Sequence, residues 1–221
     1  MEHSRKWFVG WAIGIVTAIV LFSLAALTMG RYEITLGQIW SVFFPKAGQE
    51  VSGTVENVVL NVRLPRIGLA LLAGAGLSSA GGAFQALFAN PLATPDTLGV
   101  ATGASFGAVL AILFGWPSMA IQTSALAAGL LAVALVYMVS RPKKGGGRAS
   151  VVMIVLAGMV VGSLFSALVS LVKYAADPQD VLPTITFWLM GSLSSTTKET
   201  LVLGAPFILA GMALLFLFRW K

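Results

Sequence analysis

A run of 29 residues without a charge, between Arg66 and Asp96, constrains this chain more than any other feature. Its glycines are too dense for a helix in water, where each would cost about 1 kcal/mol relative to alanine. In a bilayer, by contrast, helices associate through close packing between small residues. The run therefore predicts a helix embedded in lipid.

Composition extends this prediction to the whole chain. Hydrophobic residues make up 57% of the 221 residues and charged residues only 10%, whereas soluble domains carry about 25% charged residues. A membrane-spanning helix needs about 20 apolar residues, so the apolar content suffices for about six spans. We therefore expect an all-α, polytopic membrane helical bundle, in which residues 1–221 form a single transmembrane domain with about six transmembrane helices.

Charge and residue usage exclude several kinds of function. The net charge of +6 comes from basic residues at the ends of apolar runs, which fits membrane topology better than a nucleic-acid surface. The chain has no cysteine, and its one histidine, His3, lies in the polar N-terminal tail. Disulfides, thiolate metal sites and histidine-based catalysis in the membrane are therefore excluded. We predict no catalytic residue, no cofactor and no metal site.

Apolar runs bounded by charges or turn residues define the expected spans. They cover residues 7–29, 64–88, 97–114, 118–140, 149–172 and 201–218. A further apolar stretch, residues 181–195, is interrupted by Pro183 and Gly191 and is too short to cross a bilayer. We expect it to form a short helix on the outer side, before the last span.

The loop at 141–148 sets the predicted orientation. It carries four cations and no acid, which is typical of a cytoplasmic loop under the positive-inside rule. The N-terminus is then cytoplasmic, and the polar stretch 31–62 faces outward. Eight lysines and arginines fall inside and six outside. Arg63 and Arg66 lie outside, against the rule, and this exception invites a functional explanation.

Small residues recur at four-residue intervals and predict the faces through which helices pack. Between two of these faces, residues 90–96 include Pro91 and Pro95, which remove backbone donors and must break the helix. The predicted packing residues are Gly74, Ser78, Gly82, Gly99, Gly103, Gly107, Gly158 and Gly162.

Several motifs together resemble the permease subunits of FecCD-type ABC importers, which carry iron-siderophore complexes, haem or cobalamin inward. They are RLPR at 63–66, GGAFQALFANPLA at 81–93, PDTLGV at 95–100 and FWLMGSL at 187–193. The resemblance runs from about Trp7 to the last residue. Family members have about ten spans, so we expect this chain to hold the first six. The family's later cytoplasmic helix, which seats on the ATPase, has no match here.

The resemblance implies a transport subunit of the cytoplasmic membrane that works by alternating access and is not itself an enzyme. Its implied partners are a second permease subunit, a cytoplasmic ABC ATPase, an extracytoplasmic substrate-binding protein and the lipid bilayer, with no nucleic acid. Two alternatives remain open. One is a truncated, non-transporting permease fragment or membrane assembly component, and the other is a passive channel, whose flux would persist without ATP.

Candidate functional residues follow from the same motifs. By resemblance, Arg63 and Arg66 would pair with acidic residues of the docking substrate-binding protein, although both could instead anchor the span at lipid phosphates. Polar and helix-breaking residues in or beside the central spans are candidates for the translocation path or for interhelical hydrogen bonds. They are Gln85, Asn90, Pro91, Pro95 and Asp96. For Asn90 we favour capping of the broken helix end.

Overall fold

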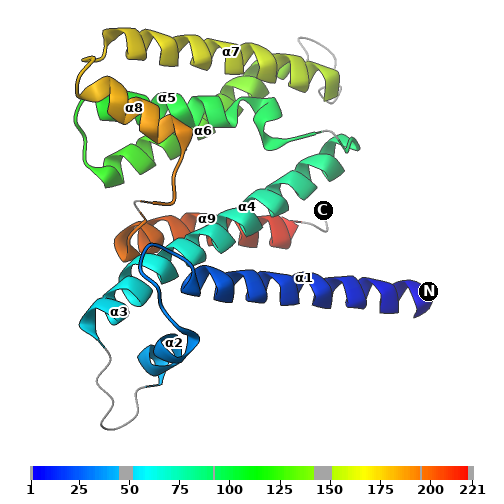
Figure 1. The fold of residues 1–221 in the computed structure, drawn as a ribbon. Helices are drawn as coiled ribbons and strands as arrows, with labels where there is room; N and C mark the ends of the chain where they lie inside the picture. Colours follow the sequence, from blue (N-terminus) through cyan, green and yellow to red (C-terminus); the bar gives the residue numbers. More distant parts are fainter. Residues whose placement is uncertain (1, 45–51, 92, 142–150, 195, 219–221) are drawn as a thin grey trace. The chain divides into compact units, whose positions relative to one another are not determined.

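The computed structural model describes residues 2–44, 52–91, 93–141, 151–194 and 196–218. Regular structure in these ranges is entirely helical (Figure 1). The α-helices are α1 (Glu2–Thr28), α2 (Leu36–Phe43), α3 (Gly53–Asn57), α4 (Leu64–Phe88), α5 (Val100–Leu113), α6 (Ser118–Ser140), α7 (Val151–Ala175), α8 (Val181–Met190) and α9 (Lys198–Phe218). A π-helix, η1 (Val58–Arg63), joins α3 to α4, and a 3₁₀ turn, η2 (Pro95–Leu98), precedes α5. The basic loop expected to set the orientation lies almost wholly outside the described residues.

Five helices in the described ranges are long and apolar enough to cross a membrane. They are Lys6–Thr28, Gly53–Phe88, Ser118–Ser140, Val151–Ala175 and Lys198–Phe218. The remaining expected span, 97–114, contains α5, which has only 14 residues. At about 1.5 Å per residue, α5 is shorter than the roughly 30 Å hydrocarbon core. The expected outer-side piece is the ten-residue α8.

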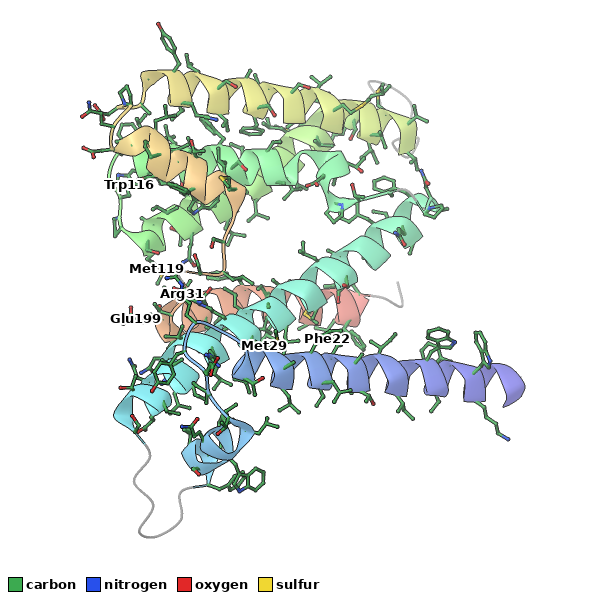
Figure 2. The ribbon with its side chains drawn as sticks, in the orientation of Figure 1. Phe22, Met29, Arg31, Trp116, Met119 and Glu199 are labelled. Carbon is green, nitrogen blue, oxygen red and sulfur yellow. The ribbon has the colours of Figure 1, made fainter. Side chains whose placement is uncertain are left out.

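The long apolar helices expose most of their side chains. In the most apolar windows of α1, of Gly53–Phe88 and of α9, no residue is buried within the protein. Phe22 on α1 is 77% exposed and is labelled in Figure 2. Apolar surface this extensive is stable against lipid or further protein, not against water. The exposure therefore supports the membrane class that composition predicts.

The chain divides into two compact units. One comprises Met1–Gly74 and Leu193–Leu209, and the other comprises Ala75–Ser192 and Ala210–Lys221. The division passes through α4 and α9, so each of these helices contributes to both units.

The first unit has a small apolar core at the end of α1. Leu27, Ile34, Ile39, Val55 and Val59 are buried together. Helix α2 begins with a capping box, in which the Thr35 hydroxyl accepts from the Gln38 N–H and the Gln38 side chain accepts from the Thr35 N–H. This cap satisfies two otherwise unpaired donors. It starts α2, whose Ile39 is buried in this core.

The π-helix keeps one side of a long helix aligned with this core. Val55, Val59 and Arg63 lie four residues apart, and all three are buried. Four residues overshoot one turn of an α-helix, whereas the wider π turn holds more than four. In an α-helix, side chains four residues apart are therefore rotated progressively around the helix axis. The wider turn of η1 offsets this rotation, so the three side chains stay on the same side of the helix. Without it, Arg63 would rotate away from α1.

The second unit is built around α5. Helix α5 packs along α6 and α7, and α8 also contacts it (Figure 1). Two apolar clusters surround it, one centred on Val109 and Ile185 and the other on Val136 and Phe165. The rings of Phe106 and Phe165 have centroids 5.7 Å apart and join α5 to α7.

Candidate functional site

Arg63 ends the π-helix with its guanidinium group turned into the protein. The residue is only 8% exposed. Its Nη1 donates to the Leu27 carbonyl, and its Nη2 donates to the Tyr32 carbonyl. Leu27 lies in the last turn of α1, where carbonyls lack helical partners and the helix dipole favours a cation. Arg63 is therefore a C-terminal cap for α1 supplied from a distant helix.

Gly30 provides the space that this cap requires. A Cβ placed on Gly30 would lie 2.8 Å from Arg63 Nη2 and 3.3 Å from its Cζ. Real Cβ atoms essentially never come within 3.0 Å of another atom, so a side chain at this position would require the guanidinium to shift. Gly30, which has no side chain, and the guanidinium of Arg63 thus pack against each other, and this contact holds the segment between α1 and α2 in place.

Arg66 lies one turn further along, in the first turn of α4, and is half-buried. Its Nη2 donates to the carbonyl of Ser194, which belongs to the same unit. Its Nε is buried and has no acceptor among the described residues. An unpaired buried N–H costs about 1–3 kcal/mol. Arg66 therefore retains hydrogen-bonding capacity that nothing described in the structure satisfies.

A cavity of about 450 Å³ connects these groups. Arg31, Arg63 and Arg66 all line it, with mainly apolar residues between them, and no described acidic residue does so. Arg31 and Met29, both lining residues, follow the end of α1 and are labelled in Figure 2. We call this space the arginine cavity. Its lining therefore carries positive charge without a described acidic side chain.

The break that the two prolines predict is present. Helix α4 ends at Phe88, and Ala89 adopts a left-handed conformation with φ 47°. The Asn90 N–H donates to the Gln85 carbonyl, and the Ala93 N–H donates to the Asn90 carbonyl. Thr94 and Thr97 then form a capping box around η2, which begins with Pro95. We call residues 89–99 the elbow.

The proposed path residues lie on or near the elbow and are accessible. Gln85, Asn90, Pro91 and Asp96 are exposed, and Pro95 is half-buried. The Asp96 carbonyl accepts from the Gly99 N–H at 2.8 Å. The nearby apolar groove of about 840 Å³, between the second half of α4 and the end of α9, is lined by none of them. These residues are close to one another in the sequence, but neither this groove nor the arginine cavity is lined by them.

Four of the glycines predicted to pack leave no room for a Cβ within the second unit, whereas a Cβ on Gly162 would make only ordinary contact, at 3.5 Å from Gly99 Cα. A Cβ on Gly103 would lie 2.8 Å from Ala132 Cβ, and one on Gly99 would lie 2.9 Å from the Gly162 nitrogen. A Cβ on Gly107 would overlap the Ser124 carbonyl, and one on Gly158 would overlap the Thr97 carbonyl. The Ser124 hydroxyl donates to the Gly107 carbonyl at 2.8 Å, as the close approach permits.

The predicted face on α4 differs from these. A Cβ on Gly74 or Gly82 would meet no described atom within 4 Å. Ser78, between them, is exposed. The four-residue spacing is the same as on α5 and α7, but in the described parts of the chain nothing packs closely against these two glycines.

Sequence reasoning did not single out Gly30 or Arg31. A signal was nevertheless present, because Arg31 is another cation on the predicted outer side and comes directly after the first apolar run. Three arginines beside predicted outer ends of spans depart from the positive-inside rule together. Their grouping could have indicated an anion-binding site.

Comparison with known proteins gives consistent matches over nearly the whole chain. A model described as the FecCD transport family matches residues 16–221. The molybdate import system permease protein MolB of Haemophilus influenzae is 39% identical over 210 residues, which cover 94% of this chain and 61% of that protein. The ferric enterobactin transport system permease protein FepD of Escherichia coli is 34% identical over 212 residues, covering 93% and 60%.

A solved structure agrees with these sequence matches. It is described as an inward-facing conformation of a metal-chelate type ABC transporter, and it matches with a TM-score of 0.75 and 35% sequence identity. The match covers 90% of this chain and 58% of the other. The chain thus spans about 60% of the length of the curated relatives cited above.

Proposed function

Because this chain belongs to the FecCD transport family, we propose that it serves in the membrane-spanning permease of an ATP-binding-cassette importer. The observation that carries the proposal is the family match over residues 16–221. The fold similarity to a metal-chelate type transporter supports it. The described helices also agree, since five of them can cross a membrane.

The proposed substrate is a metal chelate such as an iron-siderophore complex, haem or cobalamin. Relatives are named for ferric enterobactin, hemin and vitamin B12, and one is named for molybdate. Bulky chelates suit a path whose candidate helices are rich in glycine and alanine. Molybdate is the alternative that any substrate test must include.

The proposed mechanism is alternating access driven by another chain. A separate ATPase dimer binds ATP and then has a higher affinity for one of the two arrangements of a permease pair. This difference in affinity drives the change from one arrangement to the other. A second permease subunit completes the pair. We place the N-terminus in the cytoplasm and the protein in the cytoplasmic membrane, with the arginine cavity outside and the elbow inside.

Residue roles follow from this placement. Arg66, half-buried with an unsatisfied Nε, takes part in docking a substrate-binding protein. Arg63, to which the family resemblance assigned the same role, donates to two backbone carbonyls through its guanidinium. Gln85 and Asp96 line the inner part of the path, and Asn90 caps the broken helix end beside it. Pro91 and Pro95 shape this part of the path by breaking the helix.

Transport assays in a strain lacking the gene test this proposal. The strain, complemented with the wild-type gene, should accumulate one of radiolabelled ferric siderophore, haem, cobalamin or molybdate, and the uncomplemented strain should not. Uptake should stop when ATP is depleted, and the ATPase should co-purify with the permease. Flux that persists without ATP would indicate a passive channel. A folded protein that neither transports nor retains the ATPase would indicate the non-transporting alternative.

A further inference from the structure

We propose that helix α2 is an anchor on the lipid surface, with its exposed apolar face inserted at the boundary between headgroups and acyl chains. Its partner is the bilayer leaflet on the side where α1 ends. None of the residues to which the proposed transport function assigns a role lies on α2, so the anchor goes beyond that function. It requires only that α1 crosses the membrane.

Helix α2 has more apolar surface than the core of the first unit covers. Ile39, on one face, is buried in that core. Leu36, Trp40 and Phe43 are spaced by four and three residues, so they share a neighbouring face of the helix. Leu36 is 64% and Trp40 59% exposed, and Phe43 and the C-terminal cap residue Phe44 are also exposed. We call these four exposed residues the aromatic face.

The core places α2 at the level where α1 leaves the hydrocarbon. Leu27, in the last turn of α1, is buried together with Ile34 and Ile39, and α2 contacts α1 (Figure 1). The apolar span Lys6–Thr28 has 23 residues, or about 34 Å at 1.5 Å per residue. This length is close to the roughly 30 Å hydrocarbon core. The end of α1 therefore lies near the membrane boundary, and so does α2, which packs beside Leu27.

The side chains of the aromatic face are those that hold a helix at a lipid surface. Tryptophan is enriched at membrane interfaces, and helices with Trp, Phe and Leu on one face lie with that face buried about 5–10 Å into the interface. The rings of Trp40 and Phe44 have centroids 4.5 Å apart and form one aromatic surface. Met29, labelled in Figure 2, is exposed as well. Exposed apolar side chains thus continue along the chain from the span in α1 to α2.

The lack of charge on α2 favours lipid over a protein that docks from water. Residues 36–44 include no charged residue. Transient protein interfaces carry a polar rim, and charges guide the partner during association. The polar residues of α2, Gln38 and Ser41, lie outside the aromatic face by helical periodicity. They are suited to face headgroups or water while the aromatic face is in lipid.

The first experiment measures which side of α2 meets lipid, using the full chain in nanodiscs of phosphatidylethanolamine and phosphatidylglycerol. The chain has no native cysteine, so nitroxide labels can be attached to Leu36→Cys, Phe43→Cys and, as the control on the polar side, Ser41→Cys. Electron paramagnetic resonance measures collisions of each label with oxygen, which concentrates in lipid, and with a water-soluble nickel chelate. The ratio of oxygen to nickel collisions should be severalfold higher at positions 36 and 43 than at position 41.

Three other results would each overturn the proposal. Equal nickel access at all three positions would mean that the aromatic face stands in water. Shielding of positions 36 and 43 from both reagents would mean that protein, such as a second copy of this chain, covers the face. Shielding that develops only when the substrate-binding protein is added would make the face a docking surface. The measurement itself needs neither substrate nor ATPase, so a failure of the proposed transport function would leave its result unaffected.

The second experiment places one negative charge on either side of α2. Trp40→Glu should lower the oxygen-to-nickel ratio at position 36 severalfold, and Trp40→Phe should preserve it. Gln38→Glu adds the same charge on the polar side and should leave the ratio unchanged, because glutamate can also complete the capping box with Thr35. The melting temperature in detergent should fall in Ile39→Ala, which loses a buried side chain, but not in Trp40→Glu. Equal ratios in Trp40→Glu and Gln38→Glu would show that the aromatic face is not the anchor.

Discussion

Gly107 shows how a missing side chain determines helix packing. Alanine at this position would add a Cβ that overlaps the Ser124 carbonyl and lies 2.7 Å from Ala128 Cβ. Overpacking of this kind typically costs about 1–3 kcal/mol, which exceeds the roughly 1 kcal/mol that alanine gains over glycine in a helix. We expect Gly107→Ala to lower the melting temperature in detergent.

Gly82→Ala is the matched control, because a Cβ on Gly82 meets no described atom within 4 Å. Only the gain in helix propensity applies there, so the melting temperature should stay the same or rise. Equal effects of the two substitutions would mean that the contact between α5 and α6 does not govern stability.

Single residues also show which contacts a sequence pattern predicts and which it does not. Four-residue spacing identifies Gly103 and Gly107 as candidates for close approach, because the pattern is local to one helix. The pattern for Gly74 and Gly82 is identical, yet the described structure puts no atom near them. The cap that Arg63 forms joins residues 36 positions apart. Such a bond depends on tertiary placement, which no local pattern encodes.

Among the elements, the elbow depends most on one conformation. Gly99 has φ +66°, and a Cβ there would lie 2.9 Å from the Gly162 nitrogen and 3.0 Å from its Cα. Asparagine tolerates a left-handed backbone, whereas valine does not. If conformation were the only constraint, Gly99→Asn would be accepted. Because the clash is with backbone, we expect both Gly99→Asn and Gly99→Val to lower the yield of folded protein and its melting temperature. Near-native stability of Gly99→Asn alone would show that the contact with α7 is dispensable.

How closely a predicted span matches the observed helix depends on the residues at its two ends. The predicted span at 118–140 matches α6 at both ends, because Pro117 directly precedes the helix and Arg141 directly follows it. Residues 97–99 are apolar enough to extend the third span, but the Thr94 capping box and the left-handed Gly99 use them in a separate turn. Helices α2 and α3 fall in a stretch read as polar, because helices of eight and five residues are too short to show a clear apolar period.

At the scale of the whole molecule, α4 links the two candidate sites. It begins beside the arginine cavity and ends at the elbow, and its 25 residues cover about 37 Å at 1.5 Å per residue. A helix of that length crosses the hydrocarbon core once. With docking proposed outside and the inner part of the path proposed inside, we expect the two ends of α4 to face opposite sides of the membrane.

Cysteine accessibility tests this expectation directly, because the chain has no native cysteine. Tyr32 and Asn90 are both exposed in the structure. Single variants Tyr32→Cys and Asn90→Cys would be treated with a membrane-impermeant maleimide, first on intact cells and then on inverted vesicles. Tyr32→Cys should react only in intact cells and Asn90→Cys only in inverted vesicles. Reaction of both from the same side would contradict the account.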